Sequence, residues 1–503
     1  MVSSHLIARN ALYLTIASIF RKALTFLYFV IVARYMGVNT TGLFYLTICY
    51  GALFYIAMDF GLTHVFIRNA SREPAQLGPL LSETLSLKLV LAVVGAGTVF
   101  LLVNLLGYPA ITKDLIYVVV ATMVLQSFSI SFFACFRVLH QMRYEAIGMV
   151  IGKFLMLAFG GSAVFFRLSP YYLIVAIALD GIFNFLFSWY FLKTRLNLVL
   201  RLSLSWPRVS KVGLMACPFF VSALMVELYS LDVIFLSKFM DEVAVGWYSA
   251  ASKVVGSLRF LPIALSTALF PAFSVLYESE RGRVSTMFLR SQDFMMWLAF
   301  PAAAGGFILA RDFIPWVYGV NYYNSITPFQ IMSLSLIPTF LYYPIAALLN
   351  ACDQQRVNMS SLVFSILIHI ACSILLIPRL GIKGAAISAI VSSTLLFGTS
   401  IVSAYHLVGF EAKTFVQSVL KASGATIPMA AVLILLQGKI HFIILVSLGM
   451  VAYLGAAYFL QGITGGRFEK REALRRWHLI SRVVRLYPVS ESGTDRNRDL
   501  RDS

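Results

Sequence analysis

The sequence predicts an all-α membrane protein of about fourteen transmembrane helices, and three observations support this fold class. First, 59% of the 503 residues are hydrophobic, only 12% are charged, and the mean hydropathy is +0.83, which is more apolar surface than a soluble core can bury. Second, the apolar residues form runs of 18 or more between polar breaks, long enough for a helix to cross a bilayer. Third, such runs are too long for the alternating strands, each of about ten residues, that build a membrane β-barrel.

In order along the chain, the predicted spans are 10–33, 42–66, 84–106, 115–136, 146–166, 172–192, 212–236, 246–272, 289–310, 326–349, 358–377, 384–406, 416–436 and 441–463.

An internal repeat organises these spans into two halves. The stretch VARYMGVNTTGLFY at 32–45 is echoed 204 residues later by LSKFMDEVAVGWYS at 236–249. A basic residue, an aromatic residue, a methionine, a glycine and a second aromatic residue keep the same spacing in both copies. Both copies join one long apolar run to the next, as a parallel internal repeat predicts. We therefore expect two six-helix bundles related by a pseudo-two-fold axis along the membrane normal, with the last two helices peripheral.

Four basic residues inside the spans are candidate substrate-binding residues. Arg21 and Lys22 lie at the midpoint of the first span, and Lys253 and Arg259 lie in the eighth. A charge at the centre of a span costs roughly 2.5 to 3.5 kcal/mol on insertion scales, so it should face a polar cavity or a partner rather than lipid. Each of these bases is expected to line a substrate cavity, to snorkel toward the membrane surface, or to pair with Glu227 or Asp232.

Four acidic residues are candidates for coupling or charge balance. They are Asp59, Asp180, Glu227 and Asp232. Asp59 begins the stretch DFGLTHVFIR in which the second span ends, and it either faces the interior or bonds to backbone. Asp180 is near the centre of the sixth span, where it either neutralises Lys153 of the fifth or has a role in coupling. The fifth span also contains Gly148 and Gly152 at a spacing that most often indicates close helix packing.

The distribution of lysine and arginine predicts the orientation. With the N-terminus inside, cytoplasmic segments contain 24 of the 40 basic residues and the opposite loops contain 8. Because cytoplasmic loops carry the excess of positive charge, both termini are predicted to be cytoplasmic in a multi-pass protein of the cell inner membrane.

Several functions are disfavoured. The five cysteines lie in or beside spans at no metal-binding spacing, so no metal or cofactor is predicted. The net charge of +18 follows from the positive-inside bias and a basic tail, and no soluble domain supports nucleic-acid binding. There is no P-loop, and the longest outer loop, 311–325, has about fifteen residues. The chain is therefore not predicted to be an enzyme.

The expected domains are an N-terminal six-helix bundle at 1–192, an interfacial linker at 193–211, a C-terminal six-helix bundle at 212–407, helices 13 and 14 at 408–466, and a cytoplasmic tail at 467–503. Apolar residues in the first part of the tail recur at helical spacing opposite basic ones. This pattern predicts an amphipathic helix on the anionic leaflet, followed by a disordered end.

Several segments resemble the Wzx-type polysaccharide (O-antigen) flippases of the multidrug/oligosaccharidyl-lipid/polysaccharide exporter superfamily. The resembling pieces are VARYMGVNTTGLFY, DFGLTHVFIR at 59–68, the run from Asp232 through VGWYSAASKVVGSLRFLPIALSTALFP, which ends at residue 271, and LIPRLGIKGAAISAIVS at 376–392. They are packing and turn patterns spread over most of the chain, and none is a catalytic signature.

The resemblance implies two bundles arranged as a V around a central cavity lined chiefly by helices 1, 2, 7 and 8. It also implies alternating access and an undecaprenyl-diphosphate-linked oligosaccharide as substrate, with a polysaccharide polymerase as a candidate partner. Basic residues on these helices suit a diphosphate. The alternative is a cation-coupled multidrug or small-molecule exporter of the same fold, in which the four acids would couple transport to an ion.

Overall fold

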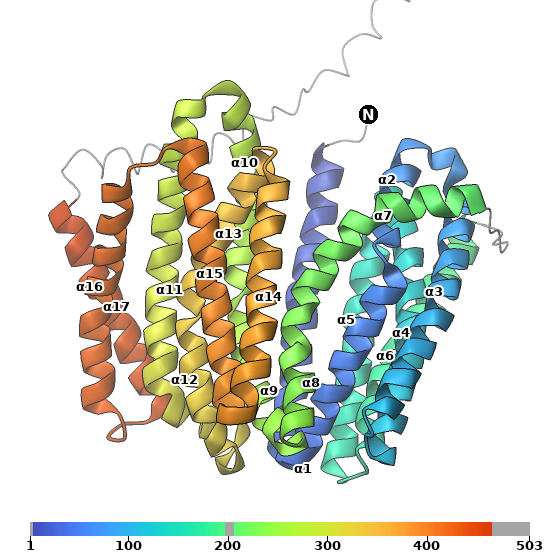
Figure 1. Cartoon of the computed structure of the whole chain (residues 1–503), viewed down its shortest axis with the longest axis horizontal. Coiled ribbons are helices and arrows are strands. Elements are labelled where there is room, and N and C mark those ends of the chain that lie inside the picture. The colour runs from blue at the N-terminus through green and yellow to red at the C-terminus, as the bar shows by residue number, and fades with distance from the viewer. Residues whose placement is uncertain (1–3, 197–205, 465–503) are drawn as a thin grey trace, which may run out of the picture.

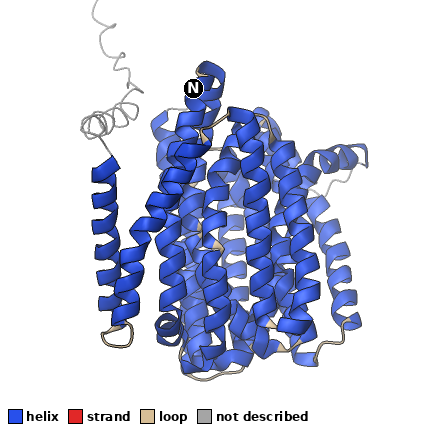
Figure 2. Cartoon of the chain, turned by 60° about the vertical axis from the view of Figure 1, so that its left-hand side comes forward, coloured by secondary structure: helices blue, strands red, loops and turns tan. Residues whose placement is uncertain are grey.

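The structure is a computed structural model that describes residues 4–196 and 206–464. Within these two ranges every regular element is a helix and no strand occurs (Figures 1 and 2). This confirms the all-α prediction. The predicted tail helix lies outside the described residues, as does the middle of the predicted linker, residues 197–205.

The elements of the first part are α1 (Ser4–Asp59), α2 (Leu62–Arg72), η1 (Pro74–Gln76), α3 (Leu77–Leu105), α4 (Ala110–Val138), α5 (Arg143–Phe165) and α6 (Tyr171–Leu196). The second part contains α7 (Trp206–Glu227), η2 (Leu228–Ser230), α8 (Leu231–Phe239), α9 (Glu242–Leu258), α10 (Phe260–Ser279), α11 (Arg281–Tyr318), η3 (Val320–Ser325), α12 (Ile326–Leu334), α13 (Leu336–Ala351), α14 (Gln355–Leu380) and α15 (Ile382–Val408), followed by α16 (Ala412–Leu436) and α17 (Phe442–Thr464).

Thirteen helical stretches in the described part of the chain are long and apolar enough to cross a membrane. The sequence predicts fourteen spans. The difference arises because the first two predicted spans belong to one stretch of 61 residues, Leu12–Arg72.

That first stretch is bent back on itself at Gly37. The rings of Tyr28 and Phe44 have centroids 5.8 Å apart, whereas sixteen residues of straight helix span about 24 Å. Gly37 has φ 83° and ψ 169°, a backbone conformation that is essentially restricted to glycine. The two arms of α1 therefore meet at the bend and diverge from it toward the same end of the molecule (Figure 1).

The helices form two groups, which Figure 1 shows beside each other. In the first group α4, α5 and α6 pack on one another, and α1 packs on α4 and α5. In the second group α14 packs on α15, and α13 packs on α10, α11 and α15. Helices α16 and α17 contact each other, and α16 lies against α11. The first residues of α1 and the last of α17 lie at the same end of the molecule (Figure 1).

The two copies of the repeat meet at the opposite end, where α1 crosses α9. A Cβ atom on Gly42 would lie 1.7 Å from the carbonyl oxygen of Glu242, and one on Gly246 would lie 2.2 Å from that of Val38. Gly42 thus lies against the residue four positions before Gly246, and Gly246 lies against the residue four positions before Gly42. This reciprocal contact is what a two-fold axis between the copies predicts.

The basic residues of the repeat also form corresponding contacts across the two groups. Arg34 donates from Nη1 to the carbonyl oxygen of Trp316, 2.8 Å away in the last turn of α11. Lys238 donates to the carbonyl oxygen of Leu106, which caps the end of α3. Cations are favourable at helix C-termini because the last carbonyls have no partner within the helix. The two halves are therefore held together at the end where α1 bends.

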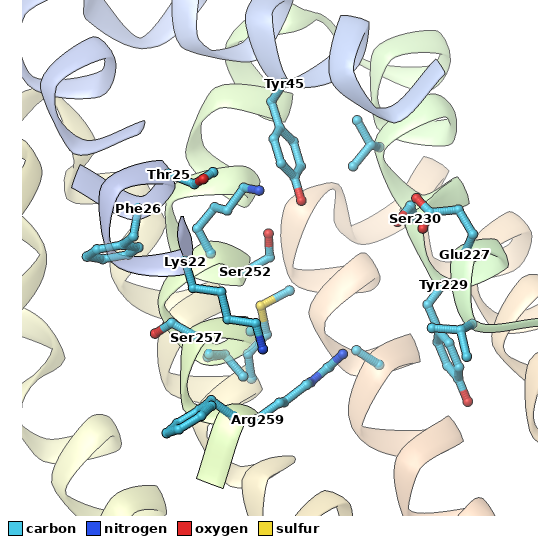
Figure 3. A pocket seen from close by; sticks show the side chains of 18 of the residues that line it. Lys22, Thr25, Phe26, Tyr45, Glu227, Tyr229, Ser230, Ser252, Ser257 and Arg259 are labelled. Atoms are coloured by element: carbon cyan, nitrogen blue, oxygen red, sulfur yellow. The ribbon is translucent and has the colours of Figure 1, made fainter. Parts of the chain in front are cut away.

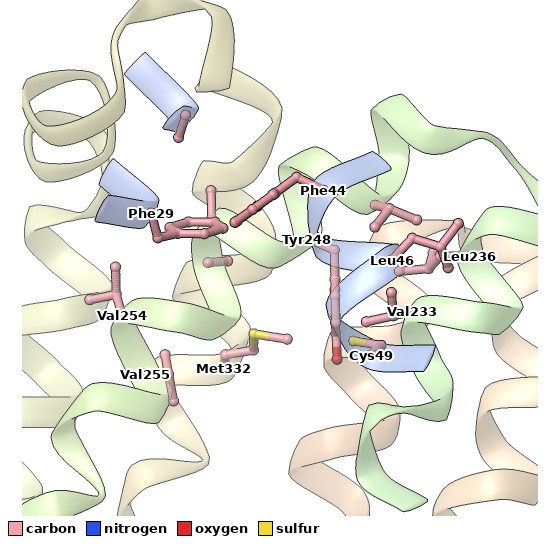
Figure 4. Close-up of a cluster of buried hydrophobic side chains, with 14 of the residues drawn as sticks. Phe29, Phe44, Leu46, Cys49, Val233, Leu236, Tyr248, Val254, Val255 and Met332 are labelled. Carbon is pink, nitrogen blue, oxygen red and sulfur yellow. The ribbon is translucent and has the colours of Figure 1, made fainter. Parts of the chain in front are cut away.

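A buried apolar cluster continues this contact toward the middle of the molecule. Phe44 and Cys49 of α1, Leu236 of α8 and Val254 of α9 belong to it (Figure 4). Because these side chains come from both halves, the apolar cluster joins the halves next to the crossing of α1 and α9.

Candidate functional site

A large cavity lies between the two groups of helices, beyond this apolar cluster. Its volume is about 800 Å³. The lining comes from α1, α5, the break between α7 and α8, α9, the start of α10, and single residues of α12, α14 and α15. The resemblance implies a cavity lined chiefly by the predicted spans 10–33, 42–66, 212–236 and 246–272. Residues of all four spans line the observed cavity, and further helices contribute to it.

All four predicted substrate-binding residues line this cavity. Arg21 and Lys22 come from α1, Lys253 from α9, and Arg259 from the junction of α9 and α10. Figure 3 shows the ends of Lys22 and Arg259 extending into the same space from opposite sides. The structure thus brings together bases that are more than 230 residues apart in the sequence.

None of these four bases forms an ion pair with a carboxylate in the described ranges. Lys22 lies 5.5 Å from the centroid of the Phe260 ring, and Lys253 lies 4.8 Å from that of Tyr45. The Nε atom of Arg21 is buried and has no hydrogen-bond partner among the described residues. Interactions with aromatic faces orient a cation without neutralising it, so these charges are not balanced by a carboxylate of the described residues.

The position of Arg259 follows from the proline three residues later. Pro262 has no N–H to donate to the carbonyl oxygen of Leu258, and its ring would clash with that carbonyl in a continuous helix. Helix α9 accordingly ends at Leu258 and α10 begins at Phe260. The eighth predicted span is therefore two helices, with the arginine at the break between them.

Two further breaks also face the cavity. The seventh predicted span is interrupted by η2, which places Glu227, Tyr229 and Ser230 on the wall opposite Lys22 (Figure 3). The tenth is interrupted at Ser335, which also lines the cavity. Interrupted helices at mid-membrane are typical of transporters, because the freed backbone groups are tolerated where they line a cavity.

The acids divide into two that line the cavity and two that do not. Glu227 and Asp232 line it. Asp232 is 1% exposed, accepts hydrogen bonds from Tyr248 at 2.7 Å and Ser373 at 2.6 Å, and lies 3.2 Å from Nε2 of His369. The cavity is lined by five basic residues, including Lys153, and by these two acids. Its formal charge is therefore positive.

The other two acids pair with lysines within the first half. Lys153 and Asp180 lie 2.6 Å apart and form an ion pair, which is the first of the two alternatives that the sequence left open. Asp59 lies 2.6 Å from Lys88, whose side chain is completely buried. Asp59 does not line the cavity, and its ion-pair partner is Lys88.

Breaking the Asp59–Lys88 pair is expected to destabilise the protein. Replacing Lys88 with methionine leaves a buried carboxylate without its partner, which costs about 3 to 5 kcal/mol. The double variant D59N/K88M should cost less than the sum of the single changes, because the two residues interact. The measurement is the thermal unfolding midpoint of the detergent-purified protein. The exposed pair Glu280–Arg283 is the matched control, and E280Q should shift the midpoint little. An unchanged midpoint for K88M would contradict a structural role.

The partners of Asp59 and Asp232 were not among the predicted site residues. Lys88 and His369 are both fully or almost fully buried inside predicted spans. An ionisable residue within a span is itself a signal of an interior partner, so the sequence contained the information. It did not contain the partner, which comes from a different helix in each case.

A family profile and curated relatives agree with the resemblance. The profile described as "Polysaccharide biosynthesis protein" matches residues 7–277. "Probable low-salt glycan biosynthesis flippase Agl15" of Haloferax volcanii is 23% identical over 503 residues, which cover 96% of this chain and 100% of Agl15. "Probable flippase AglR" of the same organism is 28% identical over 169 residues, which are 33% of this chain and 35% of AglR. The match to AglR thus spans about a third of that protein.

Solved structures share the fold. "Lipid II flippase MurJ, inward closed conformation" aligns with a TM-score of 0.74 at 15% identity over 90% of this chain and 99% of that one. An inward-facing multidrug resistance MATE family transporter of the MOP superfamily aligns with a TM-score of 0.63 at 15% identity over 82% of this chain and 98% of that one. At this identity the likeness concerns the fold alone. Because the family profile covers more than half of the sequence, the chain belongs to the polysaccharide biosynthesis protein family.

Proposed function

We propose that this chain is a flippase that moves undecaprenyl-diphosphate-linked oligosaccharides across the cytoplasmic membrane for polysaccharide biosynthesis. One observation carries the proposal: basic side chains from both halves meet in one cavity without a paired carboxylate (Figure 3). The names of the two Haloferax relatives and the fold shared with a lipid flippase support it.

The diphosphate is the part of such a substrate that these bases would hold. A diphosphate carries several negative charges and only acceptor oxygens toward the protein. Arginine suits it because its planar fork makes paired hydrogen bonds to phosphate and remains charged when it is desolvated. We propose that Arg21 and Arg259 bind the diphosphate from the two halves, with Lys22 and Lys253 adding positive charge. The chain then acts as a transporter and carries out no covalent chemistry.

Transport would follow from rocking of the halves. The contacts of Arg34, Lys238 and the two repeat glycines close the end where α1 bends. In the proposed cycle these contacts break when the halves rotate, and the cavity then opens at that end.

We place the bend outside, with both termini in the cytoplasm, as the basic residues predict. The two bundles would form a V with boundaries near 192 and 212, and the basic tail would anchor at the anionic leaflet. A polysaccharide polymerase is the proposed partner.

A cation-coupled exporter of the same fold is the second candidate. The buried group of Asp232, His369, Ser373 and Tyr248 beside the cavity favours it, because a carboxylate next to an imidazole can bind and release a proton. Positive charge on the cavity wall disfavours cationic drugs as cargo. The same buried group also fits a flippase that is driven by protons.

Transfer in proteoliposomes tests the proposal. Undecaprenyl-diphosphate-linked disaccharide is placed in the outer leaflet, and its loss of access to an impermeant glycosidase is followed over time. We expect transfer well above that of protein-free vesicles, and no uptake of the cationic dye ethidium. Dye transport without lipid transfer would overturn the flippase and support the exporter.

A further inference from the structure

We propose that a second, smaller cavity inside the first half is a saccharide subsite for the sugar next to the diphosphate. This inference rests on the proposed function. The small cavity has a volume of about 200 Å³ and is enclosed by α1, α4, α5 and α6. Arg21 and Lys153 line both cavities, so the two are adjacent, and a group bound to the diphosphate can reach the smaller one.

In each ion pair at the wall of the small cavity, the positive and negative charges cancel. Arg137 pairs with Glu145 through both Nε and Nη2, and Lys153 pairs with Asp180. Of the charged residues in this lining, Arg21 alone has no ion-pair partner among the residues that the structure describes. The small cavity therefore differs from the cationic one beside it, and its remaining polar groups are neutral hydroxyls and amides, with the ring of Phe133 as an apolar wall.

Two buried polar atoms in this lining have no partner among the described residues. One is the donor Nε of Arg21 and the other is the acceptor Oδ1 of Asn184. The orientation of the Asn184 amide follows from its neighbour: Nδ2 donates to the Asp180 carboxylate at 2.8 Å and to its backbone oxygen at 2.9 Å. Carboxylate and carbonyl oxygens only accept, so the nitrogen must face Asp180 and the oxygen must face elsewhere.

The glycine pair of α5 makes room for this amide. A Cβ atom on Gly148 would lie 3.0 Å from Oδ1 of Asn184 and 2.8 Å from the Phe133 ring, and one on Gly152 would lie 2.3 Å from Nδ2 of Asn184. The spacing of these glycines predicts a close contact between helices, and α5 does pack on α6. The glycines also admit the Asn184 side chain of α6, which keeps its amide at the wall of the small cavity.

The unpartnered donor and acceptor define the ligand chemistry. A hydroxyl group both donates and accepts, so hydroxyl groups can satisfy Asn184 and Arg21 together. A diphosphate only accepts, so it would leave Asn184 Oδ1 unsatisfied and would face two carboxylates. An ammonium cation only donates and would leave Arg21 Nε unsatisfied. Gln126, whose amide lines the cavity without a hydrogen bond to another described residue, offers a further donor and acceptor to a sugar.

The test compares lipids with and without a sugar on the full-length protein in nanodiscs. Dissociation constants are measured for undecaprenol, undecaprenyl diphosphate, and undecaprenyl diphosphate bearing one hexose or one N-acetylhexosamine from a panel. We expect at least one sugar to tighten binding about tenfold over the bare diphosphate, as one or two added hydrogen bonds would. Q126L should remove this advantage and leave the constant for bare undecaprenyl diphosphate unchanged. N184A is the second variant, and Q417L on exposed α16 is the matched control.

Each outcome bears on one proposal. Equal binding of all sugar-bearing and bare diphosphates by the wild type would mean that the small cavity holds only water, and would overturn the subsite. Retention of the sugar advantage in both Q126L and N184A would overturn it as well. If undecaprenyl diphosphate binds no more tightly than undecaprenol, the proposed function fails instead.

Discussion

Replacing Arg21 or Arg259 with alanine is expected to reduce export of lipid-linked oligosaccharide about ten- to a hundredfold. A hydrogen-bonded contact to a charged group contributes about 1.5 to 3 kcal/mol, and each arginine would contribute at least one such contact to the diphosphate. Lysine at either position should impair export only partly, because it keeps the charge and loses the paired geometry. The measurement is the accumulation of lipid-linked repeat units on the cytoplasmic side of cells that express each variant at equal abundance.

The double alanine variant distinguishes a shared ligand from two separate roles. If both arginines bind one group, removing the second should reduce export little further, because the contacts are not independent. R283A is the matched control, since this arginine is 72% exposed in its side chain and pairs with Glu280 on the surface. Wild-type export by both single alanine variants would contradict a role for Arg21 and Arg259 in transport.

Alanine at Gly42 or Gly246 is expected to open the contact between the halves and to abolish transport. A methyl group on Gly42 would lie 1.7 Å from a backbone oxygen of α9, a distance that only separation of the helices can relieve. Overpacking of this kind costs about 1 to 3 kcal/mol or more. The closed state at the bend of α1 would then be too weakly populated for the cycle to proceed.

Distances between spin labels check this expectation. Tyr35 and Val320 are exposed on the two halves, at 68% and 79%, and labelled cysteines at these positions report their separation. We expect G42A to shift the distance distribution to larger values. G97A on α3, where a Cβ would meet nothing within 4 Å, should leave both distance and transport unchanged. Unchanged distances in G42A and G246A would contradict the proposed contact.

The arrangement of elements was largely predictable from the sequence. Runs of apolar residues locate the helices because a membrane requires each backbone group to be satisfied within its own segment. The echo of 32–45 at 236–249 identified two turns that meet in the structure through Gly42 and Gly246. The costly charges at Arg21, Lys22, Lys253 and Arg259 indicated an interior cavity, and all four line one.

The tertiary structure decided between the alternatives that the sequence left open for the charges. The sequence offered Lys153 as a partner for Asp180, and the structure pairs them. Asp59, in contrast, looked equivalent to Glu227 and Asp232 in sequence, yet it is matched by Lys88 while Asp232 lies beside His369. The amide of Asn184 and the room that Gly148 and Gly152 leave for it were equally hidden. The physical reason is that burial in the membrane acts on each helix separately and is therefore visible in a single segment. Ion pairs and cavities depend on the rotation of one helix against another, which is set by packing contacts between residues far apart in the chain.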